Sequence, residues 1–250
     1  MVADDIKMND SSHSSLNVAI VIPTYNEAET LPVLIEKILE QNINELGFVV
    51  VDDGSPDGTG DIADRLADEF DGMFIVLHRE GKQGLGTAYM AGFQIALDAG
   101  ADQIIQMDAD LSHPPEVLHG LIGQLDTADV AVASRYVSGG GVDSEWSWSR
   151  RQISYWGNVG IRSILGLKVK DATSGFKGFR RKTLGSIGIE RLTLTGFGFQ
   201  PEVAYRCQKA GMDVVEYPYT FMERTAGKSK MSFSIVIEAF FALSWLRIRG

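Results

Sequence analysis

The sequence predicts an α/β fold, a mostly parallel sheet with helices on both faces and a mixed extension at the C-terminal end. Two observations lead to this prediction. From residue 18 to residue 134, short apolar runs rich in β-branched residues alternate with segments of helical periodicity, and this alternation is typical of a parallel sheet covered on both faces. Polar and charged residues directly follow four of the runs, at the strand ends where such sheets bind ligands.

The first half of the chain supplies the alternating elements. Residues 18–22 form a continuous apolar run closed by a proline, which predicts a strand, and residues 30–41 carry apolar side chains at helical spacing. A second apolar run at 48–51 and a second helical pattern at 58–70 repeat the unit. By the same criteria, further strands are expected at 73–77, 103–107 and 129–133, and further helices at 87–98 and 115–125.

The alternation breaks after residue 136. Residues 138–141 predict a flexible glycine-rich loop, and Trp146 and Trp148 follow beside Arg150 and Arg151. Indoles next to basic residues suit a membrane interface, and packing of a tryptophan in the core fits equally well. A second mixed unit is then expected, with strands near 176–179 and 214–217, a helix near 201–210, and a final apolar helix at 234–246 that is too short to span a bilayer.

A chain of 250 residues with this composition predicts one large domain with short extensions. Residues 1–16 are polar and lack the apolar core of a signal peptide, so we expect a flexible tail and a cytoplasmic protein. Residues 17–232 then form the main domain, and residues 233–250 form an apolar helix able to lie on a membrane. The single cysteine, Cys207, is expected to be a buried structural thiol in a reducing compartment.

Charge is divided unevenly along the chain. Residues 1–134 carry 24 Asp and Glu against 5 Lys and Arg, whereas residues 135–250 carry 9 against 18. The acidic half argues against nucleic-acid binding, and the basic half suits phosphate groups or an anionic membrane surface. Two solvated faces that merely differ in charge are the alternative.

Asp108-Ala109-Asp110 is the most informative motif, because it places two carboxylates at the end of the strand expected at 103–107. Side chains two apart on an extended chain point the same way. Two hard oxygen ligands can hold Mg²⁺ or Mn²⁺ and leave coordination positions for a substrate diphosphate. This is the chemistry of a sugar-nucleotide transferase, although an isolated Asp-x-Asp is more often a pair of solvated loop residues.

Other segments expected at the same edge of the sheet strengthen the first interpretation. They are 23–27, 52–55 and 134–136, all polar or charged in part. No GxGxxG motif follows the first strand, so a dinucleotide site is disfavoured. The glycine pair at 84–86 precedes a helix, where it could approach a phosphate or form only a turn.

Six motifs in this order resemble a family 2 glycosyltransferase of the GT-A (Rossmann-like) fold, and more narrowly the polyprenol-phosphate (dolichol-phosphate) mannose synthases. The resemblance runs from about Val18 to Ser232, which makes residues 17–232 the expected catalytic domain. The motifs are Ile22–Glu27, Val51–Thr59, Gly84–Tyr89, Met107–Pro115, Ser134–Tyr136 and Arg224–Lys230.

The resemblance also implies roles for particular residues. Those expected to hold the donor nucleoside are Pro23, Tyr25, Glu27, Val51 and Asp53. Those expected to hold its diphosphate and the metal are Asp108, Ala109 and Asp110, while Arg135, Arg224 and Lys230 would neutralise phosphates. Arg150 and Ser154, on one helical face, match the lipid-phosphate site. Ser112 stands where some relatives carry Gln, so it would be a metal ligand or a cap of the following helix.

The implied reaction is a single in-line displacement that moves mannose from GDP-mannose to a polyprenyl (dolichyl) monophosphate with inversion. Asp108, Asp110, Arg135 and Arg224 would be the catalytic residues, since charge builds on the leaving diphosphate. A lipid phosphate is already ionised, so no strong base is required. We accordingly expect His113 to belong to the first turn of a helix, and His78 and His119 to be peripheral.

The expected location is the cytosolic face of a membrane, with a separate membrane subunit or domain as a further possible partner. Three alternatives stay open at this point. The same motifs serve enzymes that use UDP-glucose on a lipid phosphate. A catalytically idle nucleotide-binding subunit would keep the fold, although such relatives tend to lose the metal carboxylates. A nucleotidyltransferase would leave the basic half unexplained.

Overall fold

The computed structural model describes residues 5–7, 16–223 and 242–248. Within them an eight-stranded sheet has the order β1-β4-β3-β2-β5-β8-β6-β9, and β7 and β10 form a separate parallel pair. The strands are β1 (Asp5–Lys7), β2 (Val18–Thr24), β3 (Leu46–Asp52), β4 (Phe74–His78), β5 (Gln103–Gln106), β6 (Val130–Ser134), β7 (Gly141–Val142), β8 (Lys177–Arg180), β9 (Val214–Pro218) and β10 (Thr220–Phe221).

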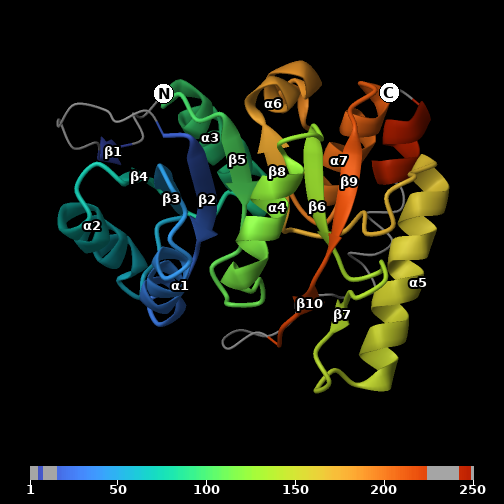
Figure 1. Cartoon of the computed structure of the whole chain (residues 1–250), viewed down its shortest axis with the longest axis horizontal. Helices are drawn as coiled ribbons and strands as arrows, with labels where there is room; N and C mark the ends of the chain where they lie inside the picture. Colours follow the sequence, from blue (N-terminus) through green and yellow to red (C-terminus); the bar gives the residue numbers. More distant parts are fainter. Residues whose placement is uncertain (1–4, 8–15, 224–241, 249–250) are drawn as a thin grey trace.

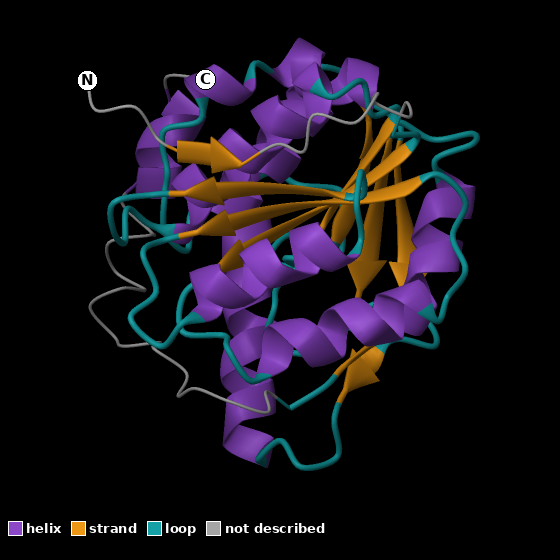
Figure 2. Cartoon of the chain, turned by 90° about the vertical axis from the view of Figure 1, so that its left-hand side faces the viewer, coloured by secondary structure: helices purple, strands orange, loops and turns teal. Residues whose placement is uncertain are grey.

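Helices cover both faces of the sheet, as Figures 1 and 2 show. They are α1 (Thr30–Leu39), α2 (Thr59–Glu69), α3 (Leu85–Asp98), α4 (Leu118–Gln124), α5 (Trp148–Leu165), α6 (Arg181–Ile187) and α7 (Phe199–Lys209), with 3₁₀ turns at Pro115–Val117 and Ile189–Arg191. Residues 242–248 are also helical. The α/β fold predicted from the sequence is confirmed, and every strand and helix expected between residues 18 and 134 is present.

Alternation along the central strands sorts the core into two layers. Ile20 and Phe48 face α1, α2 and α4, and Val21 and Val49 face α3, α6 and α7. A third, smaller cluster joins the end of α5 to α7 and to the helix at 242–248, through Leu165, Tyr205 and Leu243. Burial on both faces explains why the central strands read as unbroken apolar runs.

Pro23 lies inside β2, whereas the sequence predicted that it would close the strand. Val21 accepts a hydrogen bond from the N–H of Met107, so its polar backbone groups face β5. Pro23, two residues on, faces the same way, but β5 has ended by then at Gln106. The N–H that proline lacks is therefore not needed for pairing.

The expected mixed extension is part of the main sheet. β8 lies between β5 and β6 and is antiparallel to both, while β9 is parallel to β6. Residues 5–7, expected within a flexible tail, form the antiparallel edge strand β1 on β4. An edge strand offers unpaired backbone groups, which accounts for this addition.

Two further expectations concern the C-terminal region. Of the apolar helix predicted at 234–246, residues 234–241 lie outside the described part of the chain. Over the residues that are described, no helix is both long and apolar enough to cross a membrane.

Candidate active site

The carboxyl ends of β2, β3, β5 and β6 lie at one edge of the sheet, which we call the rim, because β2, β3 and β5 are parallel and both β5 and β6 are antiparallel to β8. Hydrogen bonds tie the loop after β2 to the loop after β3. Thr24 Oγ1 donates to Asp52 Oδ1 at 2.8 Å, and the Glu27 N–H donates to Thr59 Oγ1 at 2.9 Å. Asn26, between them, has φ 62°, a backbone conformation that non-glycine residues adopt at a cost and often at functional sites.

Of the five residues expected to hold the nucleoside, Tyr25 and Glu27 are partly exposed at the rim. The Lys82 Nζ lies 4.1 Å from the centre of the Tyr25 ring. The Val51 side chain is fully buried among the residues packed under α3. Val51 therefore presents no side chain to a ligand in this structure.

Asp53 is buried in an ion pair with Arg79, which follows β4. Arg79 Nε donates to Asp53 Oδ1 at 2.6 Å, and its Nη1 donates to Thr87 Oγ1 at 2.9 Å. Sequence reasoning missed Arg79, because no motif marks a single basic residue after a strand. The pair fixes Asp53 at the rim and joins β3 to the start of α3.

The glycine pair before α3 permits close packing. The Gly86 N–H donates to the Thr195 carbonyl at 2.9 Å, and a Cβ at Gly86 would lie 2.9 Å from Thr195 Cα and 2.8 Å from the Phe199 ring. The sequence left open whether these glycines approach a phosphate or form only a turn. The structure supports a turn, in which Gly86 allows the backbone at Thr195 to pack closely.

Asp108 is held by two residues from other parts of the chain. Tyr89 Oη donates to Asp108 Oδ1 at 2.5 Å, and burial, together with the Asp108 charge, raises the pKa of Tyr89 well above its ordinary value. The Asp108 N–H donates to His113 Nδ1 at 3.1 Å. His113 is buried and stacks on Phe176 with ring centres 4.9 Å apart. The prediction that His113 belongs to a helical turn was wrong, since the first turn begins at Pro115.

Asp110 is held locally by Ser112. Ser112 Oγ donates to Asp110 Oδ1 at 2.5 Å and the Ser112 N–H donates to the same oxygen at 3.1 Å. Leu111 between them has φ 61°. Ser112 caps no helix, because the following 3₁₀ turn has Pro114 at its N-cap and no side-chain cap. Its observed contact orients Asp110.

The segment before β8 reaches the rim because β8 runs against its neighbours. Asp171 from this segment accepts from Arg135 Nε and Nη2, both at 2.7 Å. Gly175 borders Asp108, since a Cβ there would lie 3.3 Å from Asp108 Oδ2. Sequence reasoning searched only for strands that end at the rim and so missed these residues.

The residues expected to meet a lipid phosphate lie on α5 beside the end of β6. Ser154 Oγ is 2.9 Å from Tyr136 Oη. Arg150 Nη1 donates to both carboxylate oxygens of Glu223, at 2.6 and 2.7 Å, and its guanidinium lies 3.8 Å from the Trp146 ring centre. Trp146 is buried, as the core interpretation predicts, whereas Trp148 is 76% exposed.

Arg224 and Lys230 lie outside the described residues. The chain leading to them is placed by Met222, whose N–H donates to the Ser112 carbonyl at 3.1 Å. The loop that carries Asp110 is thus next to the last described residues before Arg224.

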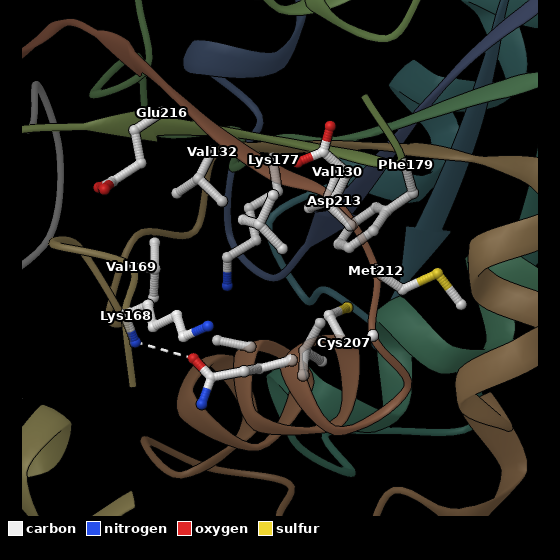
Figure 3. A pocket seen from close by; sticks show the side chains of 15 residues that line it. Val130, Val132, Lys168, Val169, Lys177, Phe179, Cys207, Met212, Asp213 and Glu216 are labelled. Carbon is white, nitrogen blue, oxygen red and sulfur yellow. Dashed lines mark hydrogen bonds between the residues drawn. The ribbon is translucent and has the colours of Figure 1, made fainter. Parts of the chain in front are cut away.

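A pocket of about 350 Å³ lies between β6, β8, β9 and α7 (Figure 3). The Lys177 amine points into it and donates to Gln200 Oε1 at 2.7 Å. Burial lowers the pKa of Lys177 to about 8 and raises that of the nearby Cys207 thiol to about 12. Cys207 is therefore the buried thiol that the sequence predicted.

The rim residues fit a hard cation shared with a ligand. Asp108 and Asp110 supply carboxylate oxygens, and the absence of a side chain at Gly175 lets its backbone approach Asp108 Oδ2, where a Cβ would lie 3.3 Å away. No third histidine, cysteine or acidic residue joins them to make a complete protein site within the described ranges. Two protein ligands leave the remaining positions of such a cation to water or to phosphate oxygens.

Comparison with known proteins places this arrangement among glycosyltransferases. The family model for glycosyl transferase family 2 matches residues 19–188. An undecaprenyl-phosphate mannosyltransferase of Micrococcus luteus is 45% identical over 90% of this chain and 91% of its own. A polyprenol monophosphomannose synthase of Mycolicibacterium smegmatis is 43% identical over 92% of this chain and 87% of its own.

Solved structures of lower sequence identity have the same fold. A mannosyltransferase of Pyrobaculum calidifontis in complex with GDP-mannose and Mn²⁺ has a TM-score of 0.60, with 17% identity over all of this chain and 68% of its own. A glucosyl-3-phosphoglycerate synthase of Mycobacterium tuberculosis, with Mn²⁺, UDP-glucose and phosphoglyceric acid, has a TM-score of 0.64, with 18% identity over 93% of this chain and 81% of its own.

Proposed function

This chain belongs to glycosyl transferase family 2, and we propose that it transfers mannose from GDP-mannose to a polyprenyl monophosphate with inversion. The observation that carries the proposal is the pair of fixed carboxylates, Asp108 and Asp110, at the rim of this fold. The two relatives named above, at 45% and 43% identity, support mannose as the sugar and a polyprenyl phosphate as the acceptor. The solved complex with GDP-mannose supports the choice of nucleotide.

In this proposal the donor nucleoside lies against the loops after β2 and β3, near Pro23, Tyr25, Glu27 and Asp53. The hydrogen bonds between these loops support a preformed binding surface. Val51 supports the surface from within the core, because its side chain is buried. This role replaces the direct contact expected from its motif.

Asp108 and Asp110 would hold Mg²⁺ or Mn²⁺ together with the donor diphosphate, and Ala109 would line the same loop. Mn²⁺ in the solved structures of this fold supports the choice of metal. The bound cation would stabilise the negative charge that builds on the leaving diphosphate. Ser112 would act through Asp110, whose carboxylate it orients.

We propose that Arg224 and Lys230 supply further positive charge to the diphosphate. The contact between Met222 and Ser112 supports this, because it brings the preceding chain to the metal-binding loop. Arg135 has a different place in the proposal. Its guanidinium is paired with Asp171. In this proposal Arg135 therefore shapes the rim and does not contact the phosphates directly.

The acceptor phosphate would meet Arg150 and Ser154 on α5. An ionised phosphate is already a nucleophile, so the step needs binding and orientation and no strong base. Arg150 is well placed for this, since it is partly exposed and its present partner, Glu223, is also partly exposed. The acceptor phosphate would replace Glu223 as the partner of the Arg150 guanidinium.

A lipid acceptor requires access to a membrane, and we propose that α5 provides it at the cytosolic face. Its outer side exposes Trp148, Ile153 and Trp156, by 76, 60 and 63%. Exposed indoles together with basic residues are typical of protein surfaces that meet lipid headgroups. A separate membrane subunit or domain is a compatible partner for the same surface.

The direct experiment is to incubate the protein with Mg²⁺ or Mn²⁺, short-chain polyprenyl phosphate and a panel of sugar nucleotides, and to identify the glycolipid and its anomeric configuration. We expect β-linked mannosyl phosphate from GDP-mannose alone. Asp110→Asn should lower turnover about a hundredfold or more, and Asp98→Asn, at an exposed site on α3, should not. Product from UDP-glucose instead would replace the proposed donor and sugar.

A further inference from the structure

We infer that Tyr89 is a positioning residue that sets the orientation of the Asp108 carboxylate for the metal and donor diphosphate. This inference rests on the proposed function. The Gly84–Tyr89 motif contributed to the family resemblance, but nothing in the sequence gave its tyrosine a task. The structure gives it one, because its hydroxyl donates to Asp108 Oδ1 across 19 residues of sequence.

The hydroxyl of Tyr89 is held in place by packing from two helices. The Tyr89 side chain is fully buried on α3. Its ring stacks nearly parallel on that of Phe199 at the start of α7, with centres 5.9 Å apart and planes 6° apart. On its own helix it stacks on Phe93 at 5.8 Å. A ring confined in this way can present its hydroxyl in one direction only.

Asp108 is constrained from its other sides as well. Its own N–H donates to His113 Nδ1, and His113 Nε2 lies 3.9 Å from Asp108 Oδ2. The His113 ring is fixed by stacking on Phe176. Gly175 approaches Oδ2 closely enough that a Cβ there would be 3.3 Å away. Three segments thus constrain Asp108: His113 contacts its backbone, Tyr89 binds Oδ1, and Gly175 borders Oδ2.

A carboxylate on a loop can rotate about two side-chain bonds, so its oxygen positions are not fixed by the backbone. A hydrogen bond from a rigid donor removes that freedom before the metal binds. Hydrogen bonds to metal ligands typically change metal affinity or activity 10-fold to 100-fold when removed. Asp110 obtains its donor from Ser112, two residues away, whereas Asp108 depends on α3 and α7 for its donor.

The test removes only the hydroxyl. We expect Tyr89→Phe to weaken Mn²⁺ binding in the presence of GDP by about 10-fold to 100-fold, measured by electron paramagnetic resonance of free Mn²⁺. Turnover should fall at limiting Mn²⁺ and recover toward the wild-type value when Mn²⁺ is saturating. Tyr205→Phe is the matched control, since Tyr205 is a buried tyrosine of α7 in a different core cluster. Its Mn²⁺ affinity should not change.

A second variant separates positioning from stability. Phe179→Leu alters the same core layer as Tyr89 and leaves the tyrosine hydroxyl in place. We expect it to lower the melting temperature and to leave Mn²⁺ affinity near the wild-type value. An equal loss of affinity in both variants, or no loss in Tyr89→Phe, would overturn the positioning role while the proposed function stands. If the wild-type protein binds no Mn²⁺ with GDP, the metal site of the proposed function fails and this role fails with it.

Discussion

Arg135 and Asp171 form an ion pair in the interior of the protein, with side chains 9% and 0% exposed. Burial alone would raise the pKa of Asp171, but Arg135 holds it below the ordinary value, and the pair raises the pKa of Arg135 in turn. Arg135 follows β6 and Asp171 precedes the antiparallel β8. The pair therefore joins two oppositely directed strands at the rim where ligands are expected.

Removing one member of this pair should be costly, because it leaves a buried charge without its partner. We expect Asp171→Asn to lower the free energy of unfolding by about 3–5 kcal/mol, measured by urea denaturation near neutral pH. The carboxylate stabilises the protein above its unfolded pKa, and this contribution is lost as the pH falls through the lowered folded value. Glu190→Gln, in an exposed pair with Arg191, should change stability by about 1 kcal/mol or less.

The first half of the fold could be predicted from the sequence because its strands are buried on both faces. Val18–Ile22 and Phe48–Val51 read as continuous apolar runs for that reason. The position of β8 could not be read in this way. β8 pairs with β5 and β6 through backbone hydrogen bonds, and such bonds leave no pattern in the side chains of the sequence.

The same distinction applies to the site. The rim position of Asp108 and Asp110 was predictable because they follow a strand at the edge where sheets of this kind bind ligands. Tyr89 and Arg79 act through contacts with residues 19 and 26 positions away, which depend on how α3 and the loop after β4 pack. Ser112 was expected to bind the metal or to cap the following helix. In the structure it donates to Asp110, across the left-handed turn at Leu111.

Lys177 makes the stability of the protein depend on pH in the alkaline range. Its side chain is 1% exposed, and burial lowers its pKa from the ordinary 10.5 to about 8. Between these values the unfolded chain binds more protons than the folded protein, so the free energy of unfolding rises with pH. Across this range the free energy of unfolding rises by about 3 kcal/mol in total.

We expect Lys177→Met to remove this rise between about pH 8 and pH 10, measured by urea denaturation of both proteins across that range. The comparison uses the slope with pH and not the absolute stability, since the variant also removes the hydrogen bonds from Lys177 to two Gln200 oxygens. Lys168→Met, at an exposed lysine of the same pocket, should keep the wild-type slope. An unchanged slope in Lys177→Met would contradict the assignment.

Arg150 is expected to serve the acceptor and not the donor. Arg150→Ala should raise the KM for polyprenyl phosphate at least tenfold and leave GDP-mannose binding unchanged, because a charged hydrogen bond to phosphate is lost. Glu223→Gln tests the proposed exchange, since it removes the charge that now holds the guanidinium. This second variant should keep or improve acceptor binding. Equal losses for donor and acceptor in Arg150→Ala would place the acceptor elsewhere.

The exposed face of α5 is expected to bind membranes through apolar area as well as charge. Trp156→Ser removes an indole that is 63% exposed, and we expect it to weaken binding to vesicles of anionic phospholipid about tenfold, as the loss of about 1.4 kcal/mol of apolar transfer energy requires. Val33→Ser, at a 37% exposed position on α1 in the acidic half, is the matched control and should bind as the wild type does. Sedimentation with vesicles measures both. High salt should weaken the remaining binding of Trp156→Ser further, because basic residues then contribute a larger share of the binding energy. Equal binding by Trp156→Ser and the wild type would show that another surface meets the membrane.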